Sequence, residues 1–218
     1  MAFPSVVAST AFNNNTANSS WTPLNNSACQ TGELLLFMST RNDSFSFTAS
    51  GDWTQVRIQA QGSVLVHQIF YTVATADTIS LTLTSSSSST CSGVFVRVAG
   101  ADGSQPFSSS TSALSAVPDP PNLNAVTAKD YLWIATRSQV STANPTAGPA
   151  NYSGLTNSAG SSVRTSIAWR QLNAASENPG TFAVASSRYA AATLAITPSN
   201  IVVPITPATG DKRSAVWL

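Results

Sequence analysis

Apolar and polar residues alternate with a period of two along most of this chain, as in β-strands with one buried face. The segment from Ile79 to Thr84 places three aliphatic side chains on one face and three hydroxyls on the other. Residues 56–60 alternate likewise, and residues 64–73 are long enough for one extended strand that carries His67. Helix-type periodicity is almost absent. The pattern therefore predicts an all-β protein whose strands keep one face in water.

Clusters of Ser, Asn, Gly and Pro separate the predicted strands, and such residues favour turns. We expect loops at four of these clusters, residues 13–20, 85–90, 104–112 and 138–148. A proline-rich stretch, residues 118–123, must be extended, because proline fixes φ and restricts the residue before it. We interpret this stretch as a crossover between two parts of one domain.

The second half of the chain repeats the layout of the first at an offset of about 98 residues. Residues 32–37 are echoed by residues 129–134, residues 63–74 align without a gap on residues 162–173, and Trp53 falls on Tyr152. Two similar β-units of this size favour a single two-sheet body.

We therefore predict a two-sheet antiparallel β-sandwich, jelly-roll-like, built from two similar halves. Its expected parts are a sandwich over residues 1–198, with halves of about 5–117 and 122–198 and a crossover at 118–121, and a C-terminal extension over residues 199–218.

Composition excludes several classes of partner. Hydrophobic residues make up 42% of the chain and charged residues 9%, which indicates a globular protein with a surface of Ser, Thr, Asn and Ala. The net charge of +1 comes from scattered residues, so we expect no nucleic-acid partner. The N-terminal residues show no signal-peptide pattern and no apolar run suits a bilayer, so we expect cytoplasmic synthesis and no membrane partner.

Two cysteines, Cys29 and Cys91, each lie just before a predicted strand. A disulfide would be possible if those strands were neighbours. Two buried free thiols are the favoured interpretation, because cytoplasmic synthesis disfavours disulfides.

Catalytic chemistry has little support in the sequence. The one histidine, His67, lies among apolar residues, and no hydrolase, phosphate-loop, dinucleotide or calcium-loop motif is present. A zinc site would need Cys29, Cys91 and His67 without the close ligand pairs that such sites show. We therefore expect no enzyme activity, no catalytic residue, no metal and no cofactor.

Aromatic residues near turns offer a different chemistry, because indole and phenol faces stack on sugar rings. Trp21, Trp53 and Tyr152 are the candidate glycan contacts. Trp53 and Tyr152 occupy equivalent positions in the two halves, which favours a core role for both. Trp21, between Asn/Ser-rich stretches, is the better candidate for an exposed contact, although it could equally cover one end of the sandwich.

Four short motifs resemble a known family. They are GELLL at residues 32–36, GDWT at residues 51–54, the run of residues 70–77 that starts with Phe-Tyr-Thr-Val-Ala, and the run of residues 94–100 that ends in Ala-Gly. Their order resembles that in a family of β-sandwich domains from tailed-phage virion proteins and some bacterial surface proteins, over about residues 5–198. The chain departs from the family pattern by having Asp52 before Trp53, and Val98 where an aromatic residue is usual.

This resemblance implies a virion component with no catalytic residues to carry over. A free-standing sandwich without a shaft or attachment module suits a capsid decoration or cement protein, located in the virion, that binds capsid or other virion proteins as a homo-oligomer, with a trimer favoured. The expected contact residues lie outside the repeat: Phe3, Pro4, Ile201, Val203, Ile205, Lys212, Arg213, Trp217 and Leu218. For the C-terminal part of this set, a tail packed along its own sandwich is an equal alternative.

The alternative function is a carbohydrate- or receptor-binding domain of a phage tail fibre or surface adhesin. It would bind a host surface glycan through loop aromatics on a rigid β-scaffold.

Overall fold

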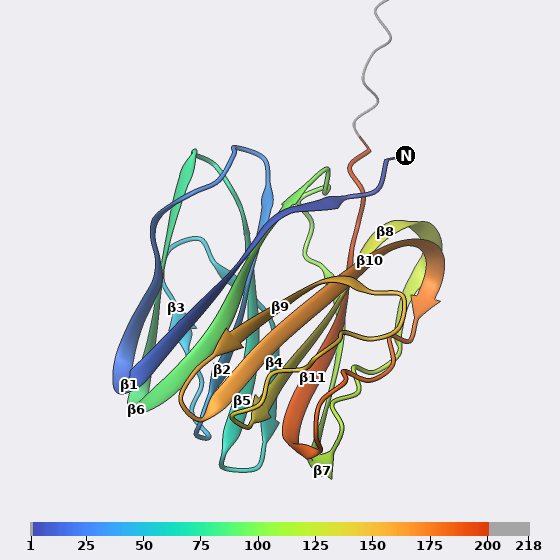
Figure 1. Ribbon diagram of the computed structural model, residues 1–218. Helices are drawn as coiled ribbons and strands as arrows, with labels where there is room; N and C mark the ends of the chain where they lie inside the picture. Colours follow the sequence, from blue (N-terminus) through green and yellow to red (C-terminus); the bar gives the residue numbers. More distant parts are fainter. Residues whose placement is uncertain (1, 201–218) are drawn as a thin grey trace, which may run out of the picture.

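The computed structural model describes residues 2–200, and these form eleven β-strands and no helix. The strands make two antiparallel sheets, so the predicted all-β, two-sheet sandwich is confirmed (Figure 1). The first sheet contains β1 (Ser5–Ala28), β2 (Leu34–Arg41), β3 (Thr48–Ala49), β4 (Thr54–Gln61), β5 (Leu65–Val73) and β6 (Thr78–Ala99). The second contains β7 (Phe107–Ala116), β8 (Leu123–Val140), β9 (Ser153–Ala159), β10 (Val163–Glu177) and β11 (Ser187–Ile196).

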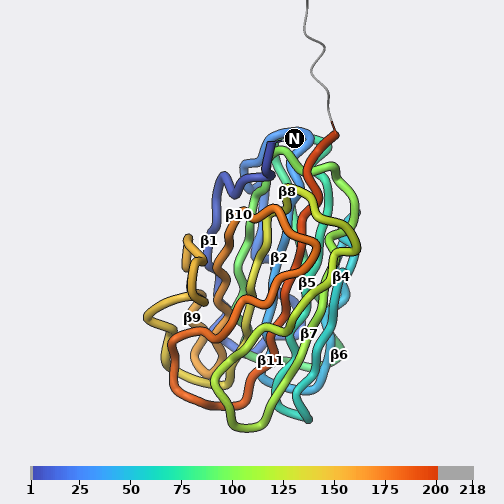
Figure 2. The backbone as a smooth tube through the Cα atoms, turned by 90° about the vertical axis from the view of Figure 1, so that its right-hand side faces the viewer, coloured from blue at the N-terminus to red at the C-terminus, as the bar shows by residue number. Residues whose placement is uncertain are grey.

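The two sheets have the same internal topology. Neighbouring strands follow the order β1-β6-β2-β5-β4 in the first sheet and β7-β11-β8-β10-β9 in the second, with β3 added to β6. Each sheet therefore takes all its strands from one half of the chain. Figure 2 shows the two layers from the side, with the edge strands β4 and β7 close together.

The strand register fixes how the halves correspond. Leu35 lies opposite Thr72 in the first sheet, and Trp133 lies opposite Arg170 in the second, a constant offset of 98 residues. The echo of residues 32–37 at residues 129–134 has an offset of 97, and the gapless alignment of residues 63–74 on residues 162–173 has an offset of 99, so each is wrong by one position. A slip of one residue would exchange the two faces of the strand, and the observed register keeps the faces matched.

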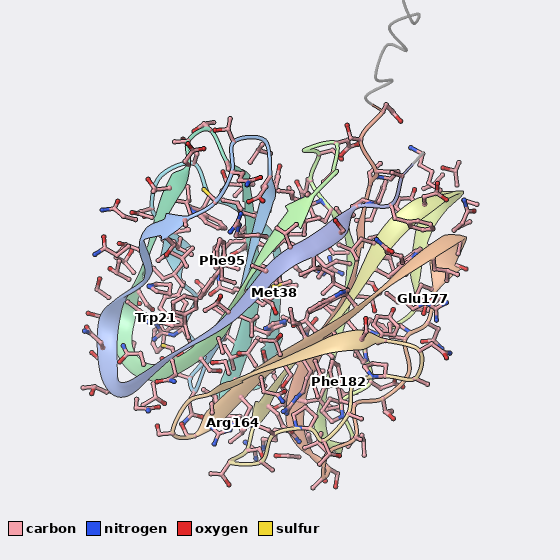
Figure 3. All side chains as sticks on the ribbon, turned by 45° about the horizontal axis from the view of Figure 1, so that its top comes forward. Trp21, Met38, Phe95, Arg164, Glu177 and Phe182 are labelled. Atoms are coloured by element: carbon pink, nitrogen blue, oxygen red, sulfur yellow. The ribbon has the colours of Figure 1, made fainter. Side chains whose placement is uncertain are left out.

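The inner layer is apolar over most of its length. Leu34, Leu36 and Met38 of β2 belong to the same buried cluster as Leu132 and Ile134 of β8, so the two halves share this core. Figure 3 labels Met38. Burial of such aliphatic side chains is the main source of free energy that holds two sheets together.

The outer faces of both sheets are also covered, so every residue of β2 is buried. On the first sheet, Trp21 from β1 and Leu83 from β6 pack with Phe37 of β2. These residues lie in the far parts of the long strands β1 and β6, which therefore fold over their own sheet. On the second sheet, Phe182, from the segment before β11, packs on Ala135 and Ala168.

Several predicted loops are strands. Residues 13–20 lie within β1 and residues 85–90 within β6, and the two strands pair, as Asn13 with Ser92 and Asn18 with Ser89. Residues 107–112 belong to β7 and residues 138–140 to β8. Ser, Thr and Asn favour turns by local hydrogen bonding, but pairing with a long partner strand satisfies the same backbone groups.

Cys29 and Cys91 are free and buried, as expected. The strands β2 and β6 are indeed neighbours, but they are antiparallel, and Cys91 pairs with Arg41 at the far end of β2 from Cys29. A disulfide between these thiols is therefore geometrically excluded.

Candidate functional site

A buried polar cluster lies between the sheets at one end of the apolar inner layer. Thr40 hydrogen-bonds to Ser138 and, at 2.6 Å, to Thr165. The Nδ1 atom of His67 lies 2.5 Å from the Ser138 hydroxyl and 3.0 Å from the Ser39 carbonyl. Hydroxyl groups and a carbonyl thus surround the imidazole, and this environment suits a structural role.

His67 is buried, and burial lowers the pKa of its imidazole to about 4. The ring is therefore neutral near pH 7. Its Nε2 atom lies 3.3 Å from the Thr136 hydroxyl. No carboxylate contributes to its pKa shift, and the group has no access to solvent, so it has neither the orienting acid nor the substrate access of a catalytic base.

Two ion pairs lie away from this cluster. The Arg97 guanidinium donates to both carboxylate oxygens of Glu33, at 2.7 and 2.9 Å, and this hydrogen bonding lowers the pKa of Glu33. Arg170 lies 3.3 Å from Glu177. Among residues 2–200, no group of three or more His, Cys, Asp or Glu side chains could hold a metal ion, and no helix could span a membrane.

One end of the sandwich brings the two ends of the described chain together. Ala101 forms a β-bridge with Pro198, and the Ser199 amide donates to the Gly100 carbonyl at 2.7 Å. Gly100 also lies beside Pro4 of the N-terminal segment. We call this end the terminal pole; Figure 1 shows it at the top of the view.

The terminal pole carries a shallow depression of about 280 Å³. Its lining comes from the turn before β2 and from the segment after β6: Gln30, Thr31, Gly32, Glu33, Ala99, Gly100, Ala101 and Ser199. The concave surface therefore lies directly beside the last described residues of the chain.

The predicted contact residues have different positions relative to this pole. Phe3 is half-buried, but Pro4 is buried and its carbonyl accepts a 2.8 Å hydrogen bond from Gln171. Pro4 thus packs on its own sandwich and offers no free surface in this structure. The other predicted contacts lie outside the described residues: Ile201, Val203, Ile205, Lys212, Arg213, Trp217 and Leu218.

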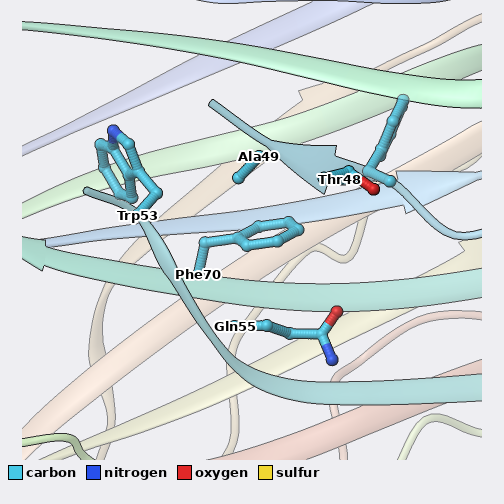
Figure 4. Close-up of a pocket in the computed structure, with 6 residues that line it drawn as sticks. Thr48, Ala49, Trp53, Gln55 and Phe70 are labelled. Carbon is cyan, nitrogen blue, oxygen red and sulfur yellow. The ribbon is translucent and has the colours of Figure 1, made fainter. Parts of the chain in front are cut away.

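A second depression, of about 290 Å³, lies on the outer face of the first sheet between β3 and β4 (Figure 4). Phe47, Trp53 and Phe70 provide aromatic lining, and Thr48, Ala49 and Gln55 complete the wall. The rings are almost fully buried, so mainly the polar side chains of the rim meet solvent.

Gln68 holds this second depression in shape. Its side-chain oxygen accepts from the Phe47 amide at 2.6 Å, and its Nε2 atom donates to the Phe47 carbonyl at 3.0 Å and to Gln55 at 2.8 Å. The carboxamide therefore links β5 to the covering segment and to β4.

The candidate glycan aromatics are mainly core residues. Trp21 is 8% exposed and packs edge-on against Phe37 at 5.5 Å, so of its two expected roles the exposed contact is wrong and the residue covers the core. Trp53 is buried, and its indole N–H donates to the Ser80 carbonyl at 3.1 Å. Tyr152 is half-buried, and its hydroxyl donates to Glu177 at 3.3 Å. Trp53 and Tyr152 each precede an edge strand, β4 and β9, as their equivalence predicts.

Sequence reasoning missed two buried arginines on the outer face of the second sheet, Arg137 and Arg164. The only signal in the sequence was that each arginine lies among residues that form a strand, where alternate side chains point to opposite faces of the sheet. Burial of that position depends on segments far away in the chain, which periodicity does not reveal.

Comparison with known proteins gives no relative from which a function could be carried over. No protein-family model matches the chain, and neither a curated protein nor a solved structure matches it significantly.

Proposed function

We propose that this protein is a non-enzymatic structural component of a tailed-phage virion, most specifically a decoration or cement protein that binds the capsid through its terminal segments. The observation that carries the proposal is the terminal pole, where Pro198 and Ser199 lie beside Gly100 and the N-terminal segment. Residues near both ends of the described range could therefore enter a single contact with one neighbouring surface.

The rest of the molecule suits a covering role. Both outer faces are packed with the chain's own side chains, and the two ion pairs described above, Arg97 with Glu33 and Arg170 with Glu177, lie on different sheets. A protein of this kind would stabilise a shell by mass action, because each contact that exists only in the assembled lattice favours that lattice. Symmetric copies, with a trimer favoured, would share the interface.

Location on the particle tests this proposal first. Gold-labelled antibodies should distribute evenly over the phage head; label confined to the tail tip would contradict it.

Truncation tests the role of the termini. Deleting residues 206–218 should abolish attachment to heads while the circular dichroism and melting temperature of the sandwich stay unchanged. Ser88→Arg, at an exposed position of β6, serves as the control and should leave occupancy unchanged. Normal occupancy of the truncated protein would refute attachment through the C-terminal segment.

The second candidate is glycan binding at the depression between β3 and β4, where Gln55 and Thr48 provide polar groups beside aromatic rings. It predicts saturable binding to host-surface polysaccharide that Gln55→Ala weakens. Trp53→Ala is unsuitable for this test, because removing a buried indole would disturb the core. Absence of binding to extracted host polysaccharide would exclude this function.

A further inference from the structure

Two arginines are buried side by side on the outer face of the second sheet. Arg137 of β8 is 0% exposed and Arg164 of β10 is 9% exposed. Ser166 lies opposite Arg137, and Gln139 lies opposite Arg164, so the two arginines are diagonal neighbours on one face of adjacent strands. Among residues 2–200, no ion pair joins either arginine to a carboxylate.

Arg137 makes hydrogen bonds only to neutral oxygens within the described residues. Its Nε atom donates to the Ser166 hydroxyl at 3.1 Å, and its Nη1 atom donates to the Gln139 side-chain oxygen. Its Nη2 atom is buried without a hydrogen-bond partner. Burial and the like charge of Arg164 lower the pKa of Arg137 to about 9, which reflects an environment that opposes positive charge.

Arg164 repeats this pattern nearer the surface. Its Nη1 and Nη2 atoms donate to the carbonyls of Val163 and Thr142, at 3.1 and 2.9 Å, and its buried Nε atom has no partner. Burial also lowers the pKa of its guanidinium.

Two segments cover this face. Ala147 forms a β-bridge with Ala183, which joins the segment after β8 to the segment before β11. The second of these segments is anchored by Phe182 in the core and by Gln139, whose Nε2 atom donates to the Ala185 carbonyl at 2.8 Å. Figure 3 labels Arg164 and Phe182 in this part of the molecule. The arginines therefore lie between the sheet and two covering segments, which a β-bridge, a buried phenylalanine and a hydrogen bond hold in place.

The first sheet shows how this chain otherwise buries an arginine. Arg41 is 0% exposed, but it pairs with Asp43 through two contacts, at 2.9 and 2.5 Å. At the offset of 98 residues, Asp43 corresponds to Ser141. The second sheet thus has two buried guanidinium groups and no carboxylate at the position that neutralises Arg41 in the first.

We propose that Arg137 and Arg164 form a binding site for a small oxyanion, a carboxylate or an inorganic sulfate or phosphate, held between the second sheet and its covering segments. The guanidinium group presents planar N–H donors that match such anions, and an anion would supply the countercharge and the missing acceptors together. Arg164, the less deeply buried member of the pair, marks the side from which the anion would enter.

The test uses the full-length protein and three simple anions. Sodium sulfate, sodium phosphate and sodium acetate are titrated against sodium chloride at matched ionic strength, and binding is followed by calorimetry and by melting temperature. We expect a saturable rise in melting temperature with at least one oxyanion. Saturation by acetate alone would assign a carboxylate, and saturation by sulfate or phosphate a tetrahedral oxyanion. Sulfate also stabilises proteins generally by exclusion from the surface, but that effect does not saturate.

Two variants locate the site, with a third as a matched control. Arg164→Gln should raise the apparent dissociation constant about tenfold or more, because it removes a buried charged donor. Arg41→Met should destabilise the fold by leaving Asp43 unpaired. It should keep the saturable response, because Arg41 already has a carboxylate partner in the chain, Asp43, and does not belong to the proposed site. An oxyanion effect that is linear in concentration and equal in wild type and Arg164→Gln would overturn the proposal.

Arg137→Met gives a second test, because the direction in which it changes the melting temperature is informative. Without added anion, we expect a melting temperature equal to or above that of the wild type, because an unpaired buried charge is replaced by an apolar group. The saturable response should disappear. A folded Arg137→Met protein that still responds like wild type would also overturn the site, and if this variant does not fold, Arg164→Gln decides.

Discussion

At the scale of single residues, His67 makes stability depend on pH. Its pKa is about 4 in the folded protein and 6.5 in its unperturbed state, so unfolding takes up a proton between these values. The stabilisation is complete above pH 6.5 and is lost as the pH falls toward 4. We expect the free energy of unfolding to drop by about 2 kcal/mol between pH 7 and pH 5, measured by denaturant titration.

The chain suits this measurement because it has one histidine. His67→Gln should remove most of the pH dependence between pH 7 and pH 5, a range in which ordinary carboxylates stay ionised. A second measurement needs no variant: the ring protons of His67 should show no titration above pH 5 by NMR. Titration near pH 6.5 in the folded protein would contradict the buried, neutral assignment.

At the scale of elements, Gly154 fixes the start of β9. Its φ is +66°, and a Cβ atom there would lie 1.9 Å from the Trp169 ring. Gly154→Ala should lower the free energy of unfolding by about 2 to 4 kcal/mol, because it combines backbone strain with overlap in a packed region. Denaturant titration checks the value.

Gly32 provides the matched control for this substitution. Its φ is +89°, but no atom lies within 4 Å of an added Cβ. Gly32→Ala should therefore cost only the backbone term, about 1 to 2 kcal/mol. Equal losses at Gly32 and Gly154 would show that the Trp169 ring moves aside without cost.

Strands with strong alternation were predictable from the sequence, whereas elements defined by distant pairing were not. The alternation of residues 79–84 predicted part of β6, because Ile79, Leu81 and Leu83 face the same apolar cluster. The Ser-rich parts of β1 and β6 were interpreted as loops, since their composition is that of turns and only their mutual pairing makes them strands. The sequence could not decide between an exposed and a covering role for Trp21 for the same reason: the fold of β1 over its own sheet carries this residue into the core.

The candidate sites were harder to predict than the strands. The internal repeat pointed to residues 129–134 of β8, yet Arg137, three positions further along that strand, is a fully buried cation that the repeat did not reveal. Its environment depends on residues 142–149 and 181–187, which meet only in the folded chain. The terminal pole likewise depends on contacts between Pro4, Gly100 and Ser199, which no local pattern encodes.

At the scale of the whole molecule, the halves are mutually dependent. The inner cluster that contains Met38 and Ile134 needs both sheets, so each half alone would expose this apolar face to water. We expect fragments 2–103 and 104–200 to be unfolded separately and to recover a dispersed NMR spectrum when mixed. The intact chain is the reference.

Each half also has a core of its own on its outer face, so the opposite result would be informative. A dispersed spectrum from either fragment alone would show that the outer cluster suffices and that the shared inner layer adds stability without being required.

The matched topology of the two sheets has a consequence for how the chain could have arisen. An offset of 98 residues in the three central strands of each sheet, 99 at the edge strands, with equal strand order is the pattern that tandem duplication of one gene segment leaves behind. In a homodimer of such a segment, a residue on the symmetry axis meets its own copy, and every substitution there occurs twice. Thr40 and Ser138 correspond to such a residue. Once the two segments are joined in one chain, each can be substituted independently of the other. The residue paired with Thr40 is His67, whereas the corresponding residue, paired with Ser138, is Thr165.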